Sequence, residues 1–114
     1  MKAIEAKRAS EARIEAETPR RWTGYYKQEG KEHAMDIQEL TVDFISGRIH
    51  GEGKDDIGGF DFKGTITGNT FEFVKQYTGA HSIYYAGEFE GQETMVGHWG
   101  CEKGEKIDEF KISR

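Results

Sequence analysis

Residues 70–89, TFEFVKQYTGAHSIYYAGEF, contain the pattern that decides the fold. Large apolar side chains alternate with polar ones on both sides of a short turn at 78–80, and this period of two is typical of β-strands. When the halves are paired across the turn, Phe73 falls opposite Tyr85 and Phe71 falls opposite Gly87. Because these residues share one face, the segment predicts an antiparallel hairpin with one buried side.

The same pattern extends in both directions along the chain. Breaks that contain glycine recur about every ten residues from Trp22 onward, a spacing typical of sandwiches and barrels. They separate eight segments near residues 22–28, 33–44, 46–54, 57–66, 69–78, 81–89, 92–101 and 104–112. Pairing across the turns places Gly64 opposite Phe73, Gly51 opposite Phe62, and Gly97 opposite Tyr85. A glycine that faces an aromatic ring is typical of a tightly curved sheet. We therefore predict an all-β fold, an eight-stranded antiparallel up-and-down β-barrel.

The N-terminal segment has a different composition. Residues 2–17 are rich in Ala, Glu, Lys and Arg, which favour an α-helix, and Thr18 and Pro19 are expected to end it. The predicted organisation is therefore an N-terminal helix and linker at 1–19 and a β-barrel domain at 20–114. The helix has few large apolar side chains, so we do not expect it to belong to the core.

Charge and composition exclude several classes of function. The net charge is −5, and no cluster of Lys and Arg could hold a nucleic-acid backbone, so no nucleic acid is expected as a partner. No apolar run approaches the roughly 20 residues of a membrane-spanning helix, and no secretory signal is visible. With one cysteine, Cys101, no internal disulfide is possible. We expect a soluble cytoplasmic protein without a membrane partner. No metal or cofactor motif occurs, so no metal or cofactor is predicted.

The order of aromatic and glycine residues resembles the small calycin-type barrels, the group that includes avidin-like and lipocalin-like proteins. More narrowly, it is similar to short bacterial β-barrels of unassigned function. The residues that carry the resemblance are Trp22, Thr23, Gly24, Tyr25, Tyr26, Gly51, Gly53, Phe73, Lys75, Tyr77, His81, Tyr85, Gly87, Gly97 and Trp99. The resemblance covers about residues 22 to 112. It implies a barrel, and it does not imply biotin or any other particular ligand.

Lys75 is the most unusual residue of the predicted inner face. It alternates in phase with Phe73 and Tyr77, and a buried ammonium group without a partner costs several kcal/mol or loses its proton. One interpretation is that Lys75 binds the carboxylate of a ligand or acts as a base. The structural alternative is that its amine reaches the barrel mouth or pairs with Asp108. Asp55 and Asp56 are interpreted as a polar turn, with a cation clamp as the alternative.

These observations favour a non-enzymatic small-molecule-binding barrel. Its pocket is expected at the polar mouth, with an anionic or aromatic ligand contacted by Lys75, Tyr77, His81, Tyr85 and Trp99. One alternative is a filled barrel that serves as a structural or protein-interaction module, with the N-terminal helix as the contact element. A homo-oligomer formed through that helix or the barrel surface is compatible with the sequence. A lyase or isomerase that moves protons through Lys75, Tyr77 or His81 is the third reading, and no catalytic residue is assigned.

Overall fold

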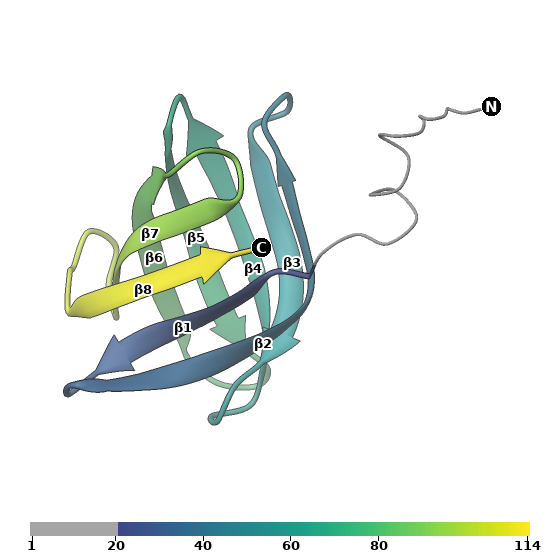
Figure 1. Ribbon diagram of the computed structural model, residues 1–114. Helices are drawn as coiled ribbons and strands as arrows, with labels where there is room; N and C mark the ends of the chain where they lie inside the picture. Colours follow the sequence, from purple (N-terminus) through teal and green to yellow (C-terminus); the bar gives the residue numbers. More distant parts are fainter. Residues whose placement is uncertain (1–20) are drawn as a thin grey trace.

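The computed structural model describes residues 21–114, which form a closed barrel of eight antiparallel strands (Figure 1). The strands are β1 (Thr23–Gln28), β2 (Lys31–Asp43), β3 (Arg48–Lys54), β4 (Gly59–Thr67), β5 (Thr70–Tyr77), β6 (Ser82–Phe89), β7 (Thr94–Gly100) and β8 (Asp108–Ser113). Each strand pairs with the next one in sequence, which confirms the predicted all-β up-and-down barrel. The predicted N-terminal helix and linker at 1–19 lie outside the described residues. Within residues 21–114, no helix is long and apolar enough to cross a membrane.

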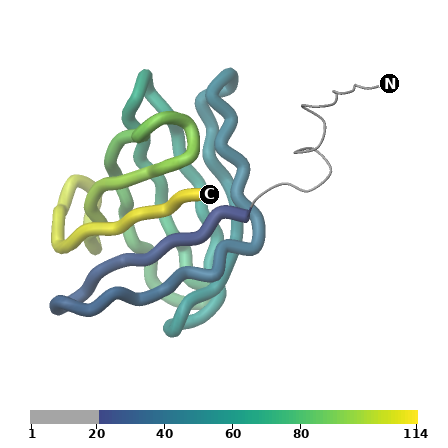
Figure 2. Tube along the Cα trace, viewed as in Figure 1, coloured from purple at the N-terminus to yellow at the C-terminus, as the bar shows by residue number. Residues whose placement is uncertain are grey.

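The first and last strands close the barrel. In Figure 2 the purple trace of β1 lies beside the yellow trace of β8, and their pairing runs from Thr23 opposite Ser113 to Tyr26 opposite Phe110. Closure gives every strand two neighbours, so the sheet has no free edge that could pair with another chain.

Most of the predicted register is confirmed. Phe73 lies opposite Gly64 on one side and Tyr85 on the other, and Gly51 lies opposite Phe62. These pairs place rings over bare backbone on the inner face, as the sequence pattern predicts.

The predicted pairing of Tyr85 with Gly97 is wrong. Tyr85 lies opposite Trp99, and Gly97 lies opposite Gly87. The prediction assumed a three-residue turn after Phe89, whereas β6 ends at Phe89 and β7 begins only at Thr94. The longer link shifts the pairing by two residues. Because side chains alternate with a period of two, an even shift leaves the same residues on the inner face.

The last link also differs from the prediction. β8 begins at Asp108 rather than near residue 104, and residues 101–107 form a loop. This loop lies against the outer face of the sheet near Val74 and Tyr84, where it makes one wall of a surface groove.

Aromatic rings fill much of the barrel interior. Phe73 stacks on Tyr85 with ring centroids 4.9 Å apart, and Phe110 meets Tyr85 edge-on at 4.7 Å. Burying one such side chain stabilises the fold by about 1.5 to 3 kcal/mol. A charged residue is also buried in this interior, since Lys75 is only 1% exposed.

The inner-face glycines yield a stability prediction. A Cβ at Gly64 would overlap the carbonyl oxygen of Glu72 and the Cβ of Phe73, so Gly64→Ala should lower the free energy of unfolding by about 1 to 3 kcal/mol or more. Gly59→Ala is the matched control, because its Cβ would meet nothing closer than the Thr78 Oγ1 at 3.8 Å. Denaturant unfolding measures both variants. An equal loss of unfolding free energy in the two variants would show that the close contact with β5 does not require glycine at position 64.

Candidate functional site

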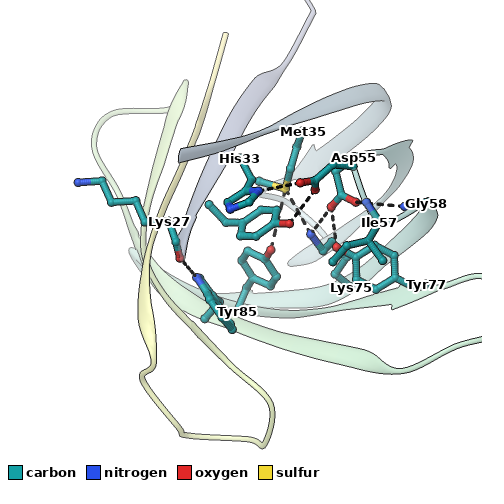
Figure 3. A network of polar contacts seen from close by, with 12 residues as sticks. Lys27, His33, Met35, Asp55, Ile57, Gly58, Lys75, Tyr77 and Tyr85 are labelled. Atoms are coloured by element: carbon teal, nitrogen blue, oxygen red, sulfur yellow. Dashed lines mark hydrogen bonds and ion pairs between the residues drawn. The ribbon is translucent and has the colours of Figure 1, made fainter. Parts of the chain in front are cut away.

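The loop between β3 and β4 places a carboxylate inside one end of the barrel. We call this end the mouth, because the links after β1, β3, β5 and β7 all lie there in an up-and-down barrel. Asp55 turns inward from the loop, and its side chain is fully buried. Its Oδ2 atom lies 2.8 Å from the Lys75 Nζ and accepts a hydrogen bond of 2.6 Å from the Tyr77 hydroxyl (Figure 3).

The loop curls around the same carboxylate. The other oxygen, Oδ1, accepts hydrogen bonds from the backbone N–H groups of Ile57 at 2.9 Å and Gly58 at 3.3 Å. The Asp55 N–H donates in turn to the Gly58 carbonyl at 3.0 Å. Such side-chain-to-backbone bonds are the reason that Asp is favoured in turns. The carboxylate therefore fixes both the loop and the lysine below it.

Lys75 lies in a largely aromatic environment. On β5 it faces Phe62 of β4 and Ile83 of β6, and its amine is 3.6 Å from the Met35 Sδ. Four ring centroids lie 4.5 to 5.3 Å from its Nζ, those of Tyr26, Phe60, Tyr77 and Tyr85. Ring faces attract a cation, and they attract it more strongly where water is excluded. The ammonium group is thus held by one carboxylate and by several ring faces.

The environment shifts the acid–base properties of these groups. Burial is the main effect, and it lowers the pKa of Lys75, while the hydrogen bond and charge of Asp55 oppose that effect. Burial also raises the pKa of Tyr77 and Tyr85, and the Asp55 carboxylate adds to it. The two phenols therefore stay protonated as donors at neutral pH.

A second carboxylate fastens the loop from outside. Asp56 accepts a hydrogen bond of 2.9 Å from the Tyr26 hydroxyl, and its other oxygen lies 2.7 Å from the His33 Nδ1. The His33 ring stacks on Tyr26 with centroids 4.9 Å apart. The hydrogen bond to His33 is the main cause of a lowered pKa for Asp56. Both side chains are partly exposed, so this contact lies at the rim of the mouth.

The structure brings together most of the predicted ligand-contacting residues. Lys75, Tyr77, Tyr85 and Trp99 are all buried in the barrel interior. The Tyr85 hydroxyl points toward the Met35 Sδ at 3.9 Å. The Trp99 indole N–H already donates to the Lys27 carbonyl at 2.8 Å, so this group fixes the barrel wall.

Two expectations about this end of the barrel are wrong. His81 is not part of the buried inner face: it lies in the turn just before β6 and is exposed, with its ring centroid 5.2 Å from that of Tyr77. Asp108 is not the partner of Lys75, because the amine pairs with Asp55 at 2.8 Å, while the Asp108 carboxylate accepts the Glu109 backbone N–H at 2.8 Å. Asp55, interpreted from the sequence as part of a polar turn, takes that role.

A sequence signal for Asp55 was present. Phe60 lies opposite Tyr77, and Tyr77 is the next inward residue after Lys75 toward the mouth. The loop before Phe60 therefore lies just above Lys75, and it carries two adjacent aspartates. An inward lysine requires an anion, and this loop is the nearest source of one. No comparable signal identifies Met35 or Tyr26.

The arrangement is suited to binding an anion. We call the Lys75 ammonium and the Tyr77 hydroxyl the anion cradle, because both donate to a single oxygen atom. Charge-assisted hydrogen bonds of this kind are about twice as strong as neutral ones.

Nowhere in residues 21–114 do three His, Cys, Asp or Glu side chains come together in a way that could hold a metal ion.

A separate hollow lies on the outside of the barrel. This outer groove has a volume of about 360 Å³ and is bounded by residues 103–106 of the β7–β8 loop. Val74, Tyr84 and Ala86 are part of its lining. Lys63, Lys103 and Lys106 line it together with Glu72 and Glu105, and the Lys103 amine lies 3.9 Å from the Glu72 carboxylate, so the groove carries charges of both signs.

The Lys75–Asp55 pair predicts a strong coupling between two substitutions. Lys75→Met leaves a buried carboxylate unpaired and Asp55→Asn leaves a buried ammonium unpaired, so each should cost about 3 to 5 kcal/mol. The double variant removes both charges and should regain most of that loss. The exposed pair Lys27 and Glu109, 3.7 Å apart, is the control and should show a coupling near zero. Denaturant unfolding measures both cycles. A coupling near zero for Lys75 and Asp55 would mean that the amine is solvated.

The phenols predict a second, pH-dependent effect. The pKa values of Tyr26, Tyr77 and Tyr85 are raised, mainly by burial. Above about pH 10 the unfolded chain loses these protons while the folded chain keeps them, so stability should fall as the pH rises further. Phenolate absorbance from three of the five tyrosines should therefore appear together with the loss of the circular dichroism of the barrel. Ionisation of all five tyrosines before any unfolding would contradict the burial of Tyr26, Tyr77 and Tyr85.

Compared with protein-family models, with curated proteins and with solved structures, the chain matches none of them.

Proposed function

We propose that this chain is a non-enzymatic binding protein of the calycin type, and that it takes a small anionic ligand at the barrel mouth. The supporting observation is the anion cradle, in which the Lys75 ammonium and the Tyr77 hydroxyl converge on one oxygen atom. The buried rings of Tyr85 and Trp99 supply apolar walls, and the exposed His81 lies at the rim.

The cost of the cradle supports a functional role. Replacing a buried ion pair by apolar side chains is often neutral or stabilising, so a barrel needs no such pair in order to fold. Clusters of groups with shifted pKa values are enriched at functional sites. Ligand sites also occur preferentially in the mouths of β-barrels. The cradle has both properties, because it combines shifted pKa values with a place at the mouth.

A protein-interaction module is the second candidate. It is favoured by the outer groove, whose apolar side chains and charges of both signs suit a peptide, and by the internal pairing of Lys75 with Asp55. The N-terminal contact element of this hypothesis lies outside the described residues. The cytoplasmic location, the homo-oligomer and the absence of catalysis stay predictions.

Binding to the full chain can be followed through backbone NMR signals. We expect formate, acetate, propionate or benzoate to shift the signals of Lys75, Tyr77 and residues 55–58, with affinities of about 1 mM or weaker because the site is closed. Acetamide and benzamide, which have no charge, should produce no such shifts.

The variant Lys75→Met/Asp55→Asn is the matched control, because it removes the cradle while leaving both buried positions uncharged. It should bind none of the four carboxylates. Shifts confined to the outer groove, or no shift with any carboxylate, would contradict the proposed site.

A further inference from the structure

We propose that Asp55 is an internal substitute for the ligand, and that a small monocarboxylate displaces its side chain from the anion cradle when the β3–β4 loop opens. This inference rests on the proposed function and names the ligand class of that site. It makes the present structure the closed state of the mouth, in which the protein supplies the carboxylate itself.

The contacts of Asp55 are those expected for a bound carboxylate. Its Oδ2 atom receives the Lys75 ammonium at 2.8 Å and the Tyr77 hydroxyl at 2.6 Å. The lysine and aspartate side chains are 1% and 0% exposed, so water takes little part in this pairing. A formate or acetate ion offers the same oxygen geometry and the same single negative charge.

The buried charge also determines which ligands are excluded. If Asp55 leaves and nothing negative replaces it, Lys75 either remains as an unpaired ammonium in an apolar interior or gives up its proton, and both changes are unfavourable at neutral pH. A neutral ligand therefore cannot replace Asp55, and a cation would be repelled. A dianion would bring one charge more than Lys75 neutralises. The site thus selects for a single negative charge.

Asp55 differs from the other contacts of Lys75 in the kind of element that carries it. Met35 and the four rings around the ammonium come from strands, whereas Asp55 comes from a loop. Its Oδ1 atom is bonded to N–H groups of the same loop, so those bonds can move with it. Gly58, with a φ of 155°, and the adjacent Gly59 give the loop backbone freedom at its end.

Opening requires few contacts to break. Besides Lys75 and Tyr77, the loop is held through Asp56 by Tyr26 and His33. The Asp56 and His33 side chains are 56% and 25% exposed, so water can replace their contact at small cost. The barrier to opening therefore consists of the cradle and the hydrogen bond from the buried Tyr26 hydroxyl to Asp56, and the incoming carboxylate restores the contacts that Asp55 gives up in the cradle.

Chemical rescue of an Asp55 variant tests the inference on the full chain. Asp55→Ala empties the cradle and should melt at a markedly lower temperature than the wild type. Acetate or formate should raise that melting temperature progressively with concentration, because binding to the folded state alone stabilises it. The variant should also bind acetate at least about tenfold more tightly than the wild type, which must first open its loop.

Three controls isolate the cradle. Chloride at the same ionic strength and neutral acetamide should give no rescue. Asp56→Ala loosens the rim but leaves Lys75 paired with Asp55, so acetate should raise its melting temperature much less than that of Asp55→Ala. Adding Lys75→Met to Asp55→Ala should abolish the acetate effect. If Asp55→Ala does not fold in any salt, Asp55→Ser provides the test, because its hydroxyl can still accept the loop N–H groups while leaving space for formate.

The outcomes separate the two proposals. Rescue by carboxylates and not by chloride or acetamide supports the inference. Equal rescue by chloride, or no rescue of either variant, overturns it. Rescue of the variants without any carboxylate binding to the wild type would show that Asp55 is a permanent structural partner, which overturns both the displacement and the proposed function. Carboxylate binding to the wild type without rescue of the variants would leave the function standing and overturn the role of Asp55.

Discussion

The Lys75 ammonium inside the barrel requires an anion beside it, and the structure of the mouth follows from that requirement. The β3–β4 loop turns inward so that Asp55 can reach the amine at 2.8 Å. The Tyr77 hydroxyl completes the carboxylate's contacts, and Asp56 holds the outside of the same loop. One buried charge thus fixes the conformation of a loop, the donors around it and the closure of one barrel end.

The curvature of the sheet makes this interior possible. At Gly64 and Gly97 the neighbouring backbone leaves no room for a Cβ. Because glycine has none, adjacent strands approach closely there while large rings occupy the inner face. The rings then surround the lysine stem and exclude water from it. Fold and site are therefore linked, because the aromatic residues that fill the barrel also make the charge at its mouth costly to leave unpaired.

Alternation and turn spacing predicted the barrel and most inward residues, including Lys75, because a closed sheet with a buried face permits few registers. Two kinds of feature escaped prediction. The length of the link between Phe89 and Thr94 was misjudged, since local sequence constrains loop length weakly. The alternation does not place Asp55 and His81 correctly, because residues in turns do not follow the period of two. An aspartate in a turn is expected to be exposed to solvent, and only the buried charge of Lys75 indicates that Asp55 lies inside.

The pairing of β1 with β8 determines where another protein or a surface can be joined to the barrel. β1 begins at Thr23 directly opposite Ser113 of β8, and both strands run between that point and the mouth. The two ends of the barrel domain therefore leave it side by side, at the pole farthest from Lys75 and Asp55. A fusion partner or a surface tether joined after Arg114 would therefore start at the pole opposite the mouth.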